Sequence, residues 1–291
     1  MVNSIGHEKE KLKLEDIIKS NAIGHAYLFT GKKSIGKKLV AIEFAKAIMC
    51  DNNSDGVACN ECVSCRTFEN NSDFKILSPE KDAIKVDMIR GMSKEIFLLP
   101  TISKRKVFII DDADSMNEQA QNALLKVLEE PPEYATIILI ASNKEKLLNT
   151  IKSRVVEFKF EGLTKDEIET ITGKEISKDA YDFSNGSIEK VIEFSNDESY
   201  EVAKEISKLL IEKDFFKINK KFEEIKNDKN LKTNISNVLE KVMYIYHSKL
   251  KNADLSVVQL IEYVSQALQN LKKNANTDLV LDMLMINACK M

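Results

Sequence analysis

The sequence predicts an α/β domain built on a parallel sheet, followed by an all-helical region. In the first 160 residues, four short apolar runs alternate with helix-patterned stretches, an order that produces parallel strands with helical crossovers. All nine glycines and all four prolines lie at or before Gly186, so the remaining 105 residues contain neither. Long helices avoid both residue types, whereas tight turns need them. The last third should therefore be helical.

Each element can be assigned from its local pattern. Asn117 is a suitable N-cap for the third helix, and Pro131-Pro132 end that helix after Glu130. Residues 161–195 are expected to form a small helical domain. The predicted strands are 26–30, 73–77, 106–110 and 136–140, and the predicted helices between them are 36–49, 84–98 and 117–130. One helix face in the last third consists of Val257, Ile261, Val264, Leu268 and Leu271, at spacings of four and three.

Composition limits the classes of function. The chain has 291 residues, enough for about two domains. Its net charge of −3 argues against a protein that coats DNA, because such binding needs many lysines and arginines on one face. The longest apolar run, 135–141, is far shorter than the roughly 18 residues of a membrane span. The charged N-terminus has no signal-peptide pattern, and we expect a cytoplasmic protein.

The stretch "GKKSIGKK" (31–38) nearly fits the phosphate-binding pattern G-x-x-x-x-G-K-[ST]. Gly31, Gly36 and Lys37 match it, and the loop lies between a predicted strand and a predicted helix, as the pattern requires. Backbone N–H groups and the helix N-terminus would hold phosphates there. The last position is Lys38, whose ammonium cannot ligate Mg²⁺. An ordinary strand-to-helix turn is the alternative.

A second nucleotide-type motif is "VFIIDDADSM" (107–116), in which an apolar strand runs into acids. Asp111 stands where a Walker B carboxylate orients Mg²⁺. Many such ATPases have Glu at the next position to polarise water, and Asp112 is one methylene shorter. The alternative is a strand end with solvated acids.

Four of the five cysteines are separated by eight, two and two residues: Cys50, Cys59, Cys62 and Cys65. Such spacing allows four thiolates to converge on one tetrahedral Zn²⁺, which leaves no open coordination position and makes the site structural. An iron–sulfur cluster is the rival interpretation, and a disulfide pair is a third. A cytoplasmic location favours metal over disulfides.

The stretch "TIKSR" (150–154) follows the fourth predicted strand. An exposed arginine at the edge of a nucleotide-binding fold can act as a finger in a neighbour's site. Arg154, with Ser153 beside it, is the candidate, and we expect it to make few core contacts. A surface salt bridge is the alternative role.

Taken in order, these motifs resemble the clamp-loader branch of the AAA+ ATPases. The segments that carry the resemblance are "GHAYLFTG" (24–31), the loop, the cysteine pattern, "DDAD" (111–114), "NALLKVLEEPP" (122–132) and "TIKSR". The resemblance covers nearly the whole chain and is specific in the first 160 residues. It implies an AAA+ (P-loop-like) domain at 1–160 with an inserted zinc module at 50–65, a helical lid at 161–197 and an all-α collar for oligomerisation at 198–291.

The resemblance also implies a role in DNA replication. Clamp loaders are rings of AAA+-type subunits that open a sliding β clamp and place it on primer–template DNA. This chain resembles a non-hydrolysing stator whose partners are motor subunits (gamma/tau) and a delta subunit. Arg154 would act in trans on a neighbour's ATP, while Gly31, Gly36, Lys37 and Asp111 form a degenerate nucleotide site. Zinc is the implied cofactor.

Departures from the family pattern support a stator. Lys38 and Asp112 weaken magnesium chemistry, and Glu189 stands where ATPase relatives have a sensor-2 arginine. Val155 replaces a cysteine in the Ser-Arg-Cys box, a packing change only. One alternative is an ATP-hydrolysing motor subunit, which needs Ser or Thr at 38. Another is a zinc-dependent DNA-binding module, which the mostly acidic or neutral segment around Arg66 disfavours.

Overall fold

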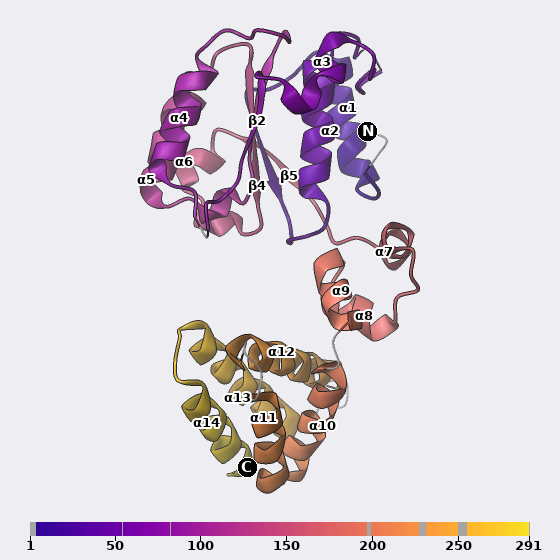
Figure 1. Ribbon diagram of the computed structural model, residues 1–291, viewed down its shortest axis with the longest axis vertical. Coiled ribbons are helices and arrows are strands. Elements are labelled where there is room, and N and C mark those ends of the chain that lie inside the picture. Colours follow the sequence, from indigo (N-terminus) through magenta and orange to yellow (C-terminus); the bar gives the residue numbers. More distant parts are fainter. Residues whose placement is uncertain are drawn as a thin grey trace. The chain divides into compact units, whose positions relative to one another are not determined.

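The computed structural model describes residues 4–53, 55–81, 83–196, 199–226, 231–249 and 255–290. The chain divides into two compact units, one up to Glu189 and one from Lys190 onward. Figure 1 shows an α/β arrangement in the first unit and helices alone in the second. We expected boundaries at 160 and 197. These stay a prediction, because the division into compact units falls at Glu189 and places residues 161–189 with the sheet.

The first unit contains a five-stranded sheet in the order β2-β3-β4-β1-β5. Every strand pair is parallel. The four predicted strands are confirmed, and a fifth was not predicted. The strands are β1 (Ala26–Thr30), β2 (Phe74–Leu77), β3 (Lys106–Ile110), β4 (Ala135–Ala141) and the unpredicted β5 (Val156–Lys159).

Helices cover both faces of this sheet (Figure 1). One face carries α1 (Glu8–Lys19), α2 (Lys37–Met49) and α3 (Val63–Arg66); the other carries α4 (Val86–Ile96), α5 (Glu118–Glu129) and α6 (Asn149–Lys152). Because strand side chains alternate between faces, Phe29 packs with Phe44 in one core and Leu28 with Leu124 in the other. Burial of both faces explains why the central strands are continuous apolar runs.

Local capping positions the helices as the sequence predicts. The Asn117 side chain accepts a hydrogen bond from the Ala120 N–H at the start of α5. Short 3₁₀ helices connect other elements: η1 (Phe68–Asn70), η2 (Ala113–Ser115) and η3 (Lys144–Lys146). After the sheet come α7 (Lys165–Thr172), α8 (Lys178–Ser184) and α9 (Ile188–Asn196). Thr164 and Glu167 form a reciprocal capping box at the start of α7.

The second unit is helical, as predicted. It contains α10 (Ser199–Glu212), α11 (Phe215–Lys226), α12 (Leu231–Lys249), α13 (Leu255–Lys272) and α14 (Thr277–Cys289). Val257, Val264 and Leu271 of the predicted face are buried in its core, and Ile261 and Leu268 pack against it. Among the described residues, no helix combines the length and apolarity that crossing a membrane requires.

Candidate functional site

The loop between β1 and α2 takes its shape from two glycines. Gly31 has φ +149°, and a Cβ there would lie 2.4 Å from the backbone oxygen of Phe160. Gly36 has φ +99° and is the N-cap of α2. Both positions exclude ordinary side chains for reasons of backbone geometry. The glycines of the motif are therefore explained by the fold itself.

Lys37 is buried and turns toward its own loop. Its Nζ donates to the carbonyl oxygen of Gly31 at 2.6 Å and also to that of Lys32. Desolvation lowers the pKa of this ammonium, and the nearby Asp112, Asp114 and Asp111 partly offset the shift. The lysine that the motif assigns to phosphate binding already has two carbonyl partners.

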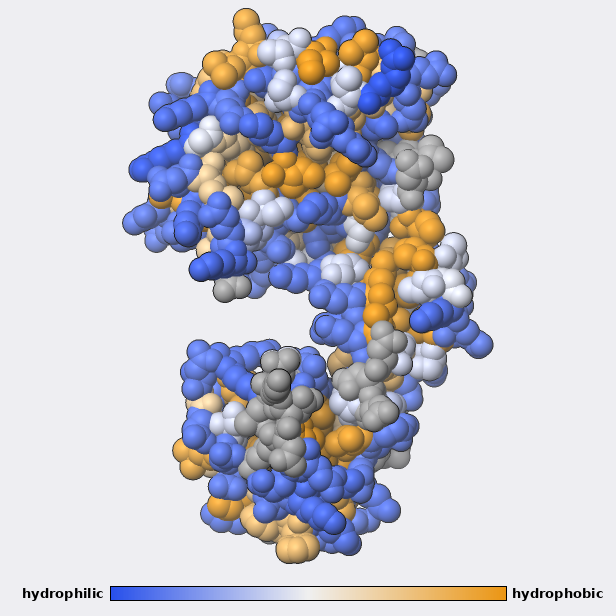
Figure 2. Space-filling view, viewed as in Figure 1, coloured by the Kyte–Doolittle hydropathy of each residue, from blue (hydrophilic) through white to orange (hydrophobic). Residues whose placement is uncertain are grey.

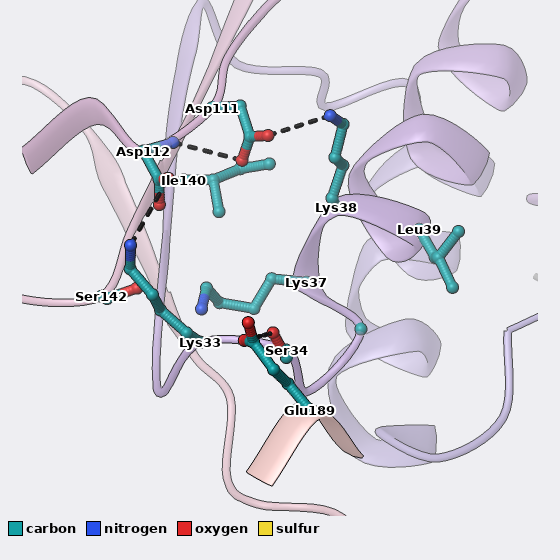
Figure 3. Close-up of a pocket in the computed structure, with 11 residues that line it drawn as sticks. Lys33, Ser34, Lys37, Lys38, Leu39, Asp111, Asp112, Ile140, Ser142 and Glu189 are labelled. Carbon is teal, nitrogen blue, oxygen red and sulfur yellow. Dashed lines mark hydrogen bonds and ion pairs between the residues drawn. The ribbon is translucent and has the colours of Figure 1, made fainter. Parts of the chain in front are cut away.

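The acids after β3 meet this loop at the carboxyl edge of the sheet. They line a cavity of about 380 Å³ together with loop residues (Figure 3). Lys38 Nζ lies 2.9 Å from Asp111 Oδ2, and Lys33 Nζ lies 3.7 Å from Asp112 Oδ2. Each carboxylate is thus paired with a loop or helix lysine.

Glu189, at the start of α9, reaches the same cavity. The Ser34 hydroxyl donates to its Oε2 at 2.6 Å, and the Ile188 N–H donates to the Ser34 carbonyl at 3.0 Å. The three positions that depart from ATPase patterns, Lys38, Asp112 and Glu189, therefore lie together around one cavity. Figure 3 shows their pairs as dashed lines.

This arrangement does not fit a magnesium–nucleotide site. The Asp111 carboxylate, which would orient the metal, is occupied by an ammonium at 2.9 Å. Lys38 supplies no oxygen ligand, and its charge opposes a divalent cation at short range. Three lysines (33, 37, 38) and three acids (111, 112, 189) line the cavity, so their formal charges balance without a metal.

The four cysteines form a second cluster, in which all four sulfur atoms lie within 4.8 Å of one another. Cys59 and Cys65 are 4.0 Å apart and Cys50 and Cys62 are 3.9 Å apart, measured between Sγ atoms. A tetrahedron with Zn–S bonds of about 2.3 Å has edges of about 3.8 Å. The thiols are free, and their separations are far beyond disulfide length.

The surroundings of the thiols also suit a metal. Backbone N–H groups of Cys62 and Glu61 donate to Cys59 Sγ and lower the pKa of this thiol to about 6. Burial raises the pKa of Cys50 and Cys65. A bound divalent cation would favour the thiolate at every position. The four residues thus fit a structural zinc ion.

Arg154 lies just after α6 and is held by two elements. Its Nη1 donates to the Thr150 carbonyl at 2.9 Å, and its Nη2 lies 2.9 Å from Glu129 Oε1 at the end of α5. The side chain is 35% exposed. Arg154 is therefore partly exposed and forms the surface ion pair given above as its alternative role, and its action as a finger stays a prediction. Ser153 donates to the Thr150 carbonyl at 3.1 Å.

The structure brings some predicted residues together and separates others. Gly36, Lys37 and Asp111 line the cavity, but neither Arg154 nor the four cysteines are among the described residues that do so. The sequence did not predict that Lys33 and Ser142 line the cavity, or that Glu129 pairs with Arg154. Glu129 carried a detectable signal, because an acid at a helix C-terminus is electrostatically unfavourable.

Comparison with known proteins decides the family. The family described as "DNA polymerase III, delta subunit" matches residues 6–164, more than half of the chain. The chain belongs to this family. It is thus a subunit of the DNA polymerase III clamp-loader family, and the resemblance seen in its motifs is confirmed.

Clamp-loader relatives bear several subunit names. DNA polymerase III subunit tau of Bacillus subtilis is 34% identical over 188 residues, covering 64% of this chain and 33% of that protein. DNA polymerase III subunit delta' of Pseudomonas aeruginosa is 36% identical over 137 residues, covering 46% and 42%. The chain spans only a quarter to a third of the length of tau and gamma/tau relatives such as those of B. subtilis and Haemophilus influenzae.

One solved structure has a similar fold over most of this chain. It is a DNA polymerase III gamma subunit-related protein from Thermotoga maritima, with a TM-score of 0.59 and 20% identity. The match covers 97% of this chain and 99% of that one. At this identity the likeness concerns the fold alone.

Proposed function

We propose that this clamp-loader subunit is a delta-prime subunit, a non-hydrolysing stator that helps load the sliding β clamp onto primed DNA. The ion pair between Lys38 and Asp111 carries this proposal. It puts an ammonium where a catalytic magnesium would need a ligand, so the chain keeps the fold of a nucleotide site without its chemistry. A gamma/tau-like motor subunit would need a metal-binding hydroxyl at position 38.

The second part of the proposal is that Arg154 acts on ATP in a neighbouring motor subunit. Support comes from its position, because it is partly exposed and is not among the described residues that line this chain's own cavity. A guanidinium can donate several hydrogen bonds to phosphate oxygens and stabilise the charge of the transition state. Ser153 would support the turn that presents it.

The helical unit is proposed as the collar that joins the ring. Figure 2 shows a mostly polar surface on each unit, interrupted by hydrophobic side chains. In α14, Val280, Leu284 and Ala288 face the core, whereas Leu279 and Met283 are 60% and 49% exposed. A helix that is apolar on opposite sides is expected to be buried on both. The exposed side would pack against motor and delta subunits.

The proposed cofactor is one structural zinc ion bound by the four cysteines. With all four positions filled by thiolates, the ion holds no water and supplies no hydrolytic chemistry. It would stabilise the segment between α2 and β2. The cysteine module would therefore serve folding and protein contacts rather than DNA binding.

ATP turnover tests both parts of the proposal. The isolated chain should hydrolyse no ATP in the presence of Mg²⁺. ATP hydrolysis by the pure chain would instead indicate a motor subunit. In a complex with motor subunits, Arg154→Ala should slow hydrolysis by roughly 10³-fold, as for other fingers supplied in trans. The matched control is Arg90→Ala, which removes an exposed guanidinium whose ion pair, with Asp87, lies within α4. Equal rates for the two variants would contradict the finger.

A further inference from the structure

The guanidinium of Arg154 is oriented by contacts within its own chain. Glu129 anchors Nη2, and the carbonyl of Thr150 anchors Nη1. Among the described residues, none accepts a hydrogen bond from the Nε–H group. A guanidinium has five N–H donors, and Nη1 also donates to Ser153 Oγ at 3.4 Å, so the Nε–H and one Nη2–H stay available for an outside oxygen ligand. The guanidinium is thus oriented within its own chain and keeps N–H donors for a further ligand.

Glu129 is in an unfavourable place for a carboxylate. It is the last residue of α5, and Glu130 follows it at the C-cap. The carbonyl end of a helix carries partial negative charge, so acids there are disfavoured. The pair with Arg154 is also exposed, with Glu129 at 49%, and such pairs add little to stability. Helix formation and folding therefore give no reason for an acid at this position.

The backbone around Glu129 is stiff. Pro131 and Pro132 follow after one residue, Glu130, and each fixes its own φ angle. Val127 and Leu128, just before it, are buried in the core under the sheet. The carboxylate is therefore attached to a well-fixed base, from which it can orient a long and flexible partner side chain.

We propose that Glu129 is a positioning residue for Arg154. This inference rests on the proposed function, in which Arg154 reaches a neighbour's triphosphate. A free arginine loses rotamer freedom when it binds, and an arginine already oriented loses less. Pre-orientation also keeps the guanidinium where charge develops in the transition state. Glu129 touches no substrate and acts only through Arg154.

The test uses the full chain assembled with its motor subunits and measures steady-state ATP hydrolysis. Glu129→Ala should lower kcat by about five- to tenfold, from the loss of one ordered side chain, with little change in KM. Glu129→Gln keeps an acceptor oxygen and should retain most of the rate. Glu130→Ala removes the same charge one residue away and is the matched control, with no expected effect.

A double variant separates this inference from the proposed function. In the Arg154→Ala background, Glu129→Ala should cause no further loss, because the group it positions is gone. An equal or faster rate for Glu129→Ala alone would overturn the inference, as would a further loss in the double variant. If Arg154→Ala itself leaves the rate unchanged, the proposed function fails, and this inference fails with it. Unchanged melting temperatures for Glu129→Gln and Glu130→Ala control for folding.

Discussion

At the residue scale, Asp73 shows how one buried charge organises a loop. Its side chain is fully buried, and its carboxylate accepts hydrogen bonds from the backbone N–H groups of Thr101, Ile102 and Ser103. Burial alone would raise the pKa of this carboxyl, but the three N–H donors and the charge of Lys106 together outweigh it and the pKa is lowered. The ionised form is therefore the one that the fold stabilises.

Asp73→Asn should lower the free energy of unfolding by about 2 kcal/mol at pH 7, since hydrogen bonds to a charged group are stronger than neutral ones. A depressed folded-state pKa gives stability that is present above the unfolded value, near pH 4, and is lost as pH falls through the folded value. The difference between the proteins should thus shrink below about pH 4. Urea unfolding of both proteins across pH measures this. A constant difference would show that charge is not the cause.

The pair between Lys38 and Asp111 makes a second prediction at this scale. Lys38→Thr removes the ammonium and supplies a hydroxyl that can ligate Mg²⁺. Nucleotide binding by this variant should become dependent on magnesium, whereas that of the unaltered chain should not. Titration of a fluorescent nucleotide with Mg²⁺ and with a chelator measures the change. Lys32→Thr is the control, because Lys32 is exposed and is not among the described residues lining the cavity.

At the element scale, Gln121 ties α5 to the segment that leads to Ser153 and Arg154. It is buried, its amide donates to the carbonyls of Met116 and Lys146, and its oxygen accepts from the Leu148 N–H at 2.8 Å. These bonds join the start of α5 to η3 and to the residue before α6. One side chain thus satisfies three backbone groups.

Gln121→Leu should reduce the free energy of unfolding by about 2–3 kcal/mol, because three backbone groups lose their partner in a buried setting. Chemical denaturation monitored by circular dichroism gives the value. Gln119→Leu, on the exposed side of the same helix, is the matched control and should change little. A similar effect of both substitutions would mean that helix propensity, not the buried network, sets the outcome.

The elements that the sequence predicts are those with both faces buried. β1, β3 and β4 are continuous apolar runs because helices cover the sheet on both sides. β5 escaped prediction because it is an edge strand with one buried residue, Phe158, between charged neighbours. α1 escaped because most of its residues are charged and only Leu14, Ile18 and Lys11 are buried.

The same contrast holds for the site. The loop motif and the cysteine spacing are local in sequence, so they could be predicted. The pairing of Ser34 with Glu189 joins residues 155 positions apart, and that of Arg154 with Glu129 joins residues 25 apart. Side-chain partners of this kind depend on how strands and helices pack. A sequence without its fold does not specify them.

At the scale of the whole molecule, the two units have separate cores. Every buried residue of the helical core lies between Ala203 and Ala288, and the two cores of the α/β unit lie between Leu14 and Phe160. The cysteine cluster belongs to the α/β unit alone. Substitution of the cysteines should therefore lower the stability of the α/β unit and leave that of the helical unit unchanged.

Metal removal tests this separation. The purified chain should contain about one equivalent of zinc, and a strong chelator should lower the melting temperature of the α/β unit, since a structural zinc stabilises the fold that binds it. The transition of the helical unit should not move. Differential scanning calorimetry with and without chelator follows both. Cys59→Ser should reproduce the shift and abolish the chelator's effect, and a chain without bound metal would contradict the proposal.

Gly31 also bears on how such a chain changes over generations. The carbonyl of Phe160 leaves no space for a Cβ there, so mutations at this codon are harmful even in a lineage that never binds ATP. Selection on the fold alone would then retain the glycine, whereas position 38 lies within α2 and has no such backbone constraint. A chain can therefore keep this glycine for the sake of its fold, and the glycine by itself is weak evidence that a chain hydrolyses ATP.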